Sequence, residues 1–137
     1  MWLLDTNVLS ELRRHDRTHP KVAAWAGALH PEDLFLSVIT ILEIEAGALR
    51  LERRDKAQGA ILRAWIGKRV LPAFEGRILP IDTAVAQRCA RLHVPDPRAE
   101  RDALIAATAL VHRLKVATRN VADFQPMGVD LFNPWEG

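Results

Sequence analysis

The chain has 137 residues, of which 49% are hydrophobic and 26% are charged, the balance of an ordinary globular domain. This length predicts one domain, residues 1–137, with a single core. A net charge of +2 is too small to indicate a nucleic-acid partner by itself, and one cysteine, Cys89, excludes an internal disulfide. Without a leader, or an apolar run of the ~20 residues that a bilayer span needs, we expect a cytoplasmic protein with no membrane partner.

Strand-like and helix-like segments alternate along the chain. The strand-like runs are Trp2–Asp5, Leu34–Val38, Arg77–Ile81, Lys115–Thr118 and Val129–Phe132. Helical spacing of apolar residues covers the stretches 22–29, 41–49, 61–70, 84–92 and 103–114. This alternation predicts a parallel sheet of about five strands with helices on both faces, and we interpret residues 94–98, rich in proline, as a surface loop.

Two acids follow the first two strands, and each has a structural explanation. Asp5 ends the first apolar run, where Asp commonly closes a turn with the polar residues after it. Glu43 stands three residues after Thr40, which is the spacing of a capping box at a helix start. Either side chain taken alone is therefore typical of local structure.

Two further acids belong to the second half of the chain. Asp102 precedes the buried run Ala103–Ala109 and has the position of a plain N-cap. Asp123 stands three residues after Asn120, a spacing found in the first turn of a short helix. These two acids also have structural interpretations when considered singly.

Considered together, the four acids indicate a metal site. The carboxyl ends of parallel strands lie along one edge of a sheet, so Asp5, Glu43, Asp102 and Asp123 are expected to meet in one cleft. Like charges at short range raise one another's pKa and destabilise the fold unless a cation neutralises them. Mg²⁺ or Mn²⁺ is the expected cation, since the five histidines show no zinc spacing.

Four stretches of the chain resemble the PIN-domain ribonucleases, and more narrowly the VapC toxins of bacterial toxin–antitoxin pairs, in their FitB-like branch. The resemblance is carried, in order, by the stretches 5–12, 36–44, 102–109 and 117–124. Two further stretches, Phe74–Pro80 and Asn133–Trp135, also look like that branch. The resemblance extends over almost the whole chain, with the motifs at the distances expected for the family.

The resemblance implies a PIN-like three-layer α/β/α sandwich and an endoribonuclease that hydrolyses RNA with a metal-activated water. It implies Mg²⁺ or Mn²⁺ held by the family's acids and orientation of ligands by the polar residues around them. It further implies a homodimeric toxin that a small cognate antitoxin neutralises in a hetero-oligomer, with operator DNA bound only through the antitoxin. The family's acids fall on Asp5, Glu43, Asp102 and Asp123, and its polar positions on Thr6, Asn7, Thr118 and Asn120.

One departure from the family and several surface residues leave alternatives open. The approach to Asp102 is unusually charged, so that Glu100 competes for the acid role, although the register of Ile105 favours Asp102. Arg119 and Arg13 are candidate contacts for the substrate backbone or ordinary surface charges. Trp25, Leu62 and Trp65 lie on helical stripes, and we expect part of their apolar area to serve a twofold interface and a groove for an antitoxin segment.

Other classes of protein fit the sequence less well. Dehalogenase-like phosphotransfer enzymes need a second Asp two residues after the first, where this chain has Asn7. Receiver domains need an acidic doublet before their phosphorylated Asp, and none is present. The remaining alternative is a catalytically silent PIN fold that binds RNA or a partner, against which the complete set of four acids argues.

Overall fold

A parallel five-stranded sheet organises the computed structural model, which describes residues 1–137. The strand order is β3-β2-β1-β4-β5, so the first strand lies at the centre. In the register, Leu3 of β1 pairs with Phe35 of β2 on one side and with Val116 of β4 on the other. All four strand pairs are parallel, and the strands are β1 (Trp2–Leu4), β2 (Leu34–Ser37), β3 (Ile78–Leu79), β4 (Lys115–Ala117) and β5 (Leu131–Phe132).

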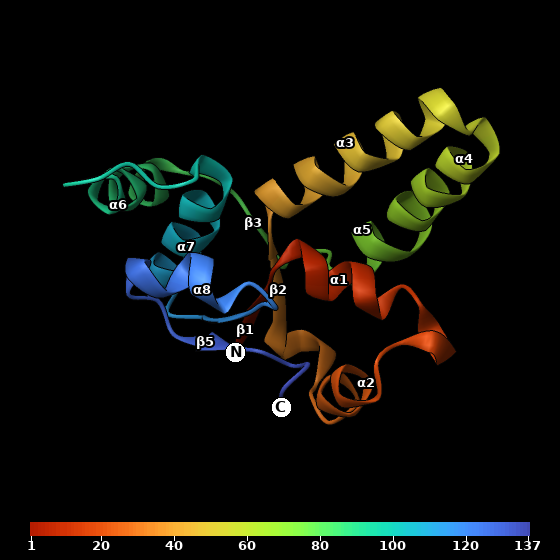
Figure 1. Cartoon of the computed structure of the whole chain (residues 1–137), viewed down its shortest axis with the longest axis horizontal. Coiled ribbons are helices and arrows are strands. Elements are labelled where there is room, and N and C mark those ends of the chain that lie inside the picture. Colours follow the sequence, from red (N-terminus) through yellow and green to blue (C-terminus); the bar gives the residue numbers. More distant parts are fainter.

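Helices cover both faces of this sheet, which makes three layers (Figure 1). On one face lie α6 (Thr83–Leu92), α7 (Glu100–His112) and α8 (Val121–Phe124). On the other lie α1 (Thr6–Leu12), α2 (Pro20–Gly27), α3 (Val38–Arg54), α4 (Lys56–Trp65) and α5 (Leu71–Ala73). Leu3 and Leu4, fully buried neighbours on β1, belong to different core clusters because successive strand residues point to opposite faces. The predicted α/β/α sandwich with a central parallel sheet is confirmed.

The predicted strands are all present, although each is shorter than its apolar run. Asp5 leaves β1 with extended dihedrals and becomes the N-cap of α1. The two edge strands contain only two residues each, Ile78–Leu79 and Leu131–Phe132. A short edge strand leaves few unpaired backbone groups for another chain to pair with. The prediction of a polar turn after Asp5 is wrong, because helix α1 begins directly at Thr6.

Each of the five predicted helices begins earlier than the sequence suggested. Helix α3 begins at Val38, where the Ser37 hydroxyl accepts a hydrogen bond from the amide of Ile39 at 3.0 Å. Helix α7 begins at Glu100 with Ala99 at its N-cap. The segment 94–98 is a loop between helices, as predicted. None of the helices combines the length and apolarity needed to cross a bilayer.

Helices α3 and α4 form a projecting hairpin, visible at the upper right of Figure 1. Asp55 ends α3 and caps α4 through a hydrogen bond from the amide of Gln58 at 3.1 Å. Gly59 lies where the two helices touch, and a Cβ atom there would overlap the backbone of Glu52. The close crossing of the hairpin therefore requires glycine at this position. From α4 the chain continues through a π-helical turn, Ile66–Val70, into α5.

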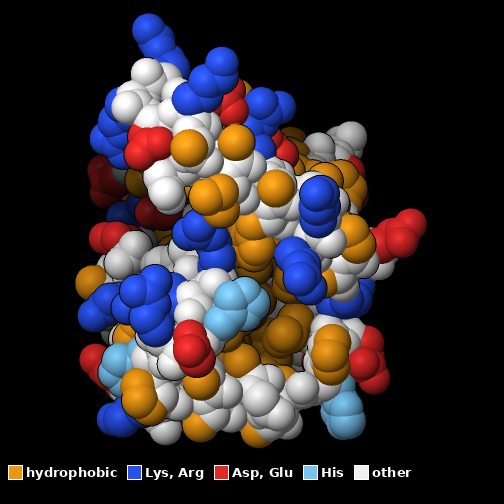
Figure 2. Space-filling model, turned by 90° about the vertical axis from the view of Figure 1, so that its right-hand side faces the viewer, with side chains coloured by type: hydrophobic (Ala, Val, Ile, Leu, Met, Phe, Trp, Pro, Cys, Tyr) orange, Lys and Arg blue, Asp and Glu red, His pale blue; other side chains and the backbone are white.

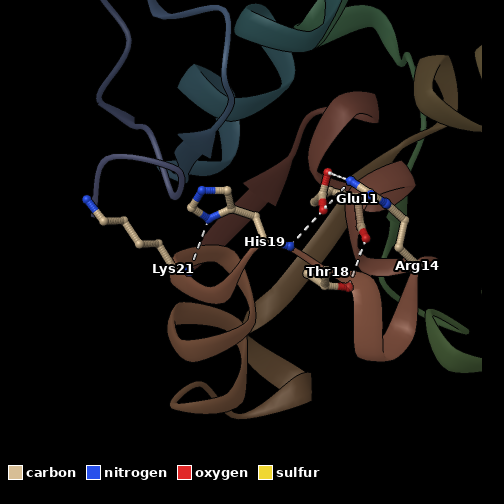
Figure 3. Close-up of polar contacts among 5 residues, drawn as sticks. All are labelled: Glu11, Arg14, Thr18, His19 and Lys21. Carbon is tan, nitrogen blue, oxygen red and sulfur yellow. Dashed lines mark hydrogen bonds and ion pairs between the residues drawn. The ribbon is translucent and has the colours of Figure 1, made fainter.

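A buried carboxylate, Glu11, joins α1 to the start of α2 (Figure 3). The carboxylate accepts a hydrogen bond from the amide of His19 at 2.8 Å and forms an ion pair with Arg14 at 3.2 Å. The backbone carbonyl of Glu11 accepts a hydrogen bond from the Thr18 hydroxyl at 3.0 Å. The imidazole of His19 in turn caps α2 at the amide of Lys21. The hydrogen bond from His19, ahead of the Arg14 contacts, holds the pKa of Glu11 below its usual value.

Candidate active site

Asp5 lies at the centre of the carboxyl edge of the sheet and is 5% exposed. Its carboxylate accepts three hydrogen bonds, from the Thr118 hydroxyl at 2.7 Å, the Thr6 amide at 2.8 Å and the Asn7 side chain at 3.3 Å. Burial raises the pKa of Asp5 above its usual 3.8, as do the nearby charges of Glu43 and Asp123, while the Thr118 and Thr6 bonds act against them. Asp5 is the N-cap of α1 rather than the residue that closes a turn, and capping uses only one of its contacts.

Glu43 reaches the same edge from the second turn of α3. Its carboxylate accepts the Thr6 hydroxyl at 2.6 Å and lies 3.9 Å from the guanidinium of Arg101. The predicted capping box is wrong, because Ser37 caps the helix and the buried Thr40 hydroxyl is directed to Thr6 at 3.4 Å instead. A capping box therefore does not explain this acid, whose carboxylate contacts Thr6 and Arg101 at the edge instead.

Asp102 is the third residue of α7 and is partly buried. The plain N-cap interpretation is wrong, because the cap position is Ala99 and no side chain caps this helix. Burial first, and then the charges of Asp5, Asp123 and Glu43, raise the pKa of Asp102 above its usual value of 3.8. The carboxylate therefore lies within electrostatic range of the other three acids.

Asp123 approaches from α8 on the β4 side and is exposed. Its amide donates to the carbonyl of Asn120 at 3.1 Å, which matches the predicted first turn of a short helix. Its charge raises the pKa of both Asp5 and Asp102. The charges of Glu43 and Asp123 thus act on both Asp5 and Asp102 at this edge of the sheet.

The carboxylate oxygens at this edge are ligands that suit a hard divalent cation, although they do not converge on a single position. No three Asp, Glu, His or Cys side chains stand close enough to hold an ion in their present positions. Burial, together with the charges of the neighbouring acids, raises the pKa of Asp5 and Asp102. Mg²⁺ uses few protein carboxylates and keeps several waters, so a loose set of acids on separate elements suits it.

The predicted polar residues form a network around Asp5. The Asn7 side chain donates to Asp5 and to the Thr118 hydroxyl at 3.4 Å, and its oxygen accepts the amide of Arg119 at 3.3 Å. The amide of Asn120 donates to the same Thr118 hydroxyl at 3.0 Å. This network fixes the loop after β4 to the first acid. The guanidinium of Arg119 lies over the ring of Trp135, 5.0 Å from its centroid.

Glu100 takes no part in the acid cluster. It is exposed at the first residue of α7, and its charge adds to burial in raising the pKa of the Cys89 thiol. It does not contribute to the raised pKa of Asp5 or Asp102. Of the two candidates on this helix, Asp102 is the one that the fold brings to the edge.

The sequence interpretation missed Arg101, which belongs to the site through Glu43. The charged approach to Asp102 drew attention to Glu100, whereas the neighbouring Arg101 reaches across from α7 to α3. An Arg immediately before a candidate acid on a helix was the available signal. Its single positive charge offsets part of the negative charge of the four acids.

An apolar groove lies next to the acids, between α1 and the segment 65–74 (Figure 2). The view shows an apolar floor with basic side chains and a histidine at its rim. Its lining includes Leu9, Leu12, Arg13, His15, Trp65 and Phe74. Arg13 and Trp65 also line a second hollow that contains Thr6 and Glu43, so the groove leads to the acidic edge.

The chain is an α/β protein with a parallel sheet, and acids from separate elements lie at the carboxyl edge of that sheet. Residues 2–125 match the PIN domain model, and the chain belongs to this family. It is 40% identical to Toxin FitB of Neisseria gonorrhoeae, covering 98% of this chain and 99% of that protein. It is 36% identical to VapC ribonuclease Y4jK of Sinorhizobium fredii, covering 99% of both.

Solved structures agree with these relatives. The crystal structure of FitAcB from Neisseria gonorrhoeae has a TM-score of 0.90 and 39% identity, and each chain is covered completely. A toxin–antitoxin complex from Klebsiella pneumoniae has a TM-score of 0.70 and 30% identity over 98% of both chains. The chain is therefore a homologue of toxins of toxin–antitoxin systems, and a relative named a ribonuclease supports the hydrolase class.

Proposed function

We propose that this chain is a divalent-metal-dependent endoribonuclease and the toxin of a type II toxin–antitoxin pair. The observation that carries the proposal is the electrostatic coupling of Asp5, Asp102, Glu43 and Asp123 at one edge of the sheet. Four separate elements contribute these acids, from positions far apart in the chain. A function that needs concentrated negative charge explains why the repulsion is retained.

The proposed active site assigns distinct tasks to the acids and their neighbours. Asp5, Glu43 and Asp102 would hold Mg²⁺ or Mn²⁺, with Asp123 as a direct ligand or one acting through water. When bound, the ion supplies positive charge that acidifies water and stabilises charge on the scissile phosphate. Thr118 and Asn7 orient the carboxylate of Asp5, and Thr6 orients that of Glu43.

The remaining polar residues organise the loop that follows β4. Asn120 supports Thr118 through its backbone amide, which keeps the hydroxyl of Thr118 directed at Asp5. This arrangement supports the proposed role of Thr118 and Asn120 around the acids. Arg119, in the same loop, remains exposed and is proposed to meet the RNA backbone.

We propose that a small antitoxin neutralises the chain and that the toxin is a homodimer in their complex. The apolar groove beside Trp65, with Arg13 at its rim, supports the first part because it leads to the hollow that contains Glu43. An antitoxin segment in this groove is expected to direct an Arg or Lys toward the acids. Operator DNA would be bound only through the antitoxin. Sedimentation of the purified chain tests the dimer, and co-expression with the adjacent antitoxin gene tests neutralisation.

The alternative is a catalytically silent PIN module that binds RNA or a partner. A cleavage assay separates the two: the purified chain is incubated with total RNA in EDTA, Mg²⁺ or Mn²⁺, beside the matched variant Asp5→Asn. We expect cleavage by the wild type in the presence of metal and none by the variant. Intact RNA under every condition, with a properly folded wild type, would favour the silent module.

A further inference from the structure

Two exposed arginines near the acids are each held against a tryptophan. The guanidinium of Arg119 lies 5.0 Å from the ring centroid of Trp135, and that of Arg13 lies 5.7 Å from the ring centroid of Trp65. Both distances fall within the ~6 Å range of a cation–π interaction. Because both rings are partly buried against the core, each provides a fixed support for a side chain that would otherwise be mobile.

The Arg119 pair is connected to the first acid. The amide of Arg119 donates to Asn7, whose side chain donates to Asp5. Thr118, the preceding residue, donates directly to Asp5 and pairs with the carbonyl of Phe132, three residues before Trp135. Two chain segments therefore bring the arginine and its tryptophan to the β4 side of the acids.

The Arg13 pair lies toward the second acid. Arg13 and Trp65 line the same hollow as Glu43, together with the hydroxyl-bearing residues Thr6 and Ser10. Glu43 belongs to the helix that follows β2, whereas Arg119 follows β4, and these two strands lie on opposite sides of β1. The two arginines are therefore associated with opposite sides of Asp5.

Neither arginine is neutralised within the chain. The three ion pairs present involve Arg14, Arg63 and Arg101 instead. An acidic edge repels the phosphates of a polynucleotide, so a substrate strand needs fixed cations beside the acids. Arginine suits this task because its planar fork donates to two phosphate oxygens while its face remains on an aromatic ring.

We propose that Arg13 and Arg119 bind backbone phosphates of a single RNA strand on the two sides of the acids, and that Trp65 and Trp135 are positioning residues for them. This inference rests on the proposed function for its substrate class and adds the path of the strand across the site. Each arginine neutralises one phosphate, and each tryptophan limits the conformations of its arginine before RNA arrives. Losing either ring leaves the charge in place but costs affinity through lost order.

The experiment measures binding separately from cleavage. A fluorescein-labelled single-stranded RNA of about 12 nucleotides, in the range that single-strand binders cover, is titrated with protein in the Asp5→Asn background. Anisotropy is recorded with Mg²⁺ at several KCl concentrations, and a gel checks that the RNA stays intact. We expect Arg13→Ala and Arg119→Ala each to weaken binding and to lower the slope of log affinity against log salt by about 0.7.

The tryptophans are tested by coupling to their arginines. Trp135→Leu should weaken binding about two- to fivefold with an unchanged salt slope, as expected for a lost cation–π support, and Trp135→Phe should retain most of the affinity. In the Arg119→Ala background, Trp135→Leu should have no further effect. Should Trp135→Leu fail to fold, the same coupling is measured at the second pair, with Trp65→Leu in the presence and in the absence of Arg13→Ala.

Arg54→Ala is the matched control, because it removes an exposed arginine at the far end of α3 and should leave the salt slope unchanged. An unchanged slope in both Arg13→Ala and Arg119→Ala would overturn the proposal, as would an undiminished effect of Trp135→Leu without Arg119. Wild-type cleavage in Mn²⁺ is measured in parallel. If the wild type cleaves RNA but the salt slopes of the arginine variants are unaltered, only the proposed RNA path is refuted. If those slopes are lowered but the wild type does not cleave, the nuclease function is refuted and the RNA path is supported.

Discussion

The Thr118 hydroxyl donates a hydrogen bond of 2.7 Å to the carboxylate of Asp5, joining two residues that are 113 positions apart. Thr118 directly follows β4 and Asp5 directly follows β1, and the parallel register of these two strands brings them together. The bond stabilises the charged form of a buried carboxylate and lowers its pKa, against the effects of burial and of neighbouring acids. The charge state of the central acid therefore depends on a neutral neighbour.

Replacing Thr118 with valine should raise the pKa of Asp5. Without the hydroxyl, the ionised carboxylate loses its shortest hydrogen bond, and a larger fraction of Asp5 stays protonated at a given pH. The acidic limb of the pH profile of metal-dependent RNA cleavage should then move to higher pH. Thr118→Ser keeps the hydroxyl and is expected to restore the wild-type limb. Equal profiles for valine and serine would show that the bond does not control the charge of Asp5.

Asp5→Asn should abolish RNA cleavage without lowering the stability of the metal-free chain. Asparagine still caps α1 and differs little in shape, so the fold is expected to persist. Because burial and neighbouring charges raise the pKa of Asp5, ionisation of this group weakens the fold as the pH rises above its usual value of 3.8. At neutral pH the variant should therefore melt at the same temperature as the wild type or higher. Circular dichroism in EDTA and an RNA cleavage assay in Mn²⁺ measure the two effects, and a melting temperature well below that of the wild type would contradict the charge argument.

Glu11→Gln tests the carboxylate that joins α1 to α2. The pKa of Glu11 is lowered in the folded chain, so its charged form stabilises the fold above the usual value of 4.5, and this contribution is lost as the pH falls through the lowered pKa. The free energy of unfolding of wild type and variant should therefore differ most near neutral pH and converge in acid. Urea titrations across this range measure the difference. Glu75→Gln, at an exposed position, is the control and should follow the wild type throughout.

Gly59→Ala should destabilise the α3–α4 hairpin, whereas Gly47→Ala should not. A helical Gly→Ala change normally stabilises by up to about 1 kcal/mol, because alanine loses less backbone entropy. At Gly59 the added methyl group would overlap the backbone of Glu52, and overpacking of this kind costs about 1–3 kcal/mol. At Gly47 nothing lies within 4 Å of the added atom. Thermal melts should thus move in opposite directions, and parallel shifts would mean that the two helices separate readily.

The strands and acids were predictable because both depend on local sequence signals. Buried runs such as Leu34–Ser37 and the residues that end them appear directly in the apolar pattern. Helix starts were less predictable, since Ser37 and Thr40 are both suitable caps and only packing against α1 decides between them. The contact between Arg101 and Glu43 joins α7 to α3, and the sequence gives no signal that these two helices lie side by side. Such side-chain pairs depend on tertiary placement, which apolar spacing does not encode.

Divalent cations should stabilise the folded chain through the same acids. Burial and the neighbouring negative charges raise the pKa of Asp5 and Asp102, and an ion bound only by the native state would stabilise the charged carboxylates. At a hundredfold excess over Kd, such a ligand stabilises by about 2.7 kcal/mol, or roughly 5 °C or more in melting temperature for a domain of this size. Mn²⁺ should therefore raise the melting temperature, and Asp102→Asn should reduce the rise while raising the melting temperature in EDTA. Asp96→Asn, in the exposed loop before α7, is the matched control and should keep the full response. Melting curves that ignore millimolar Mn²⁺ and Mg²⁺ would mean that the four carboxylates repel one another without forming a cation site.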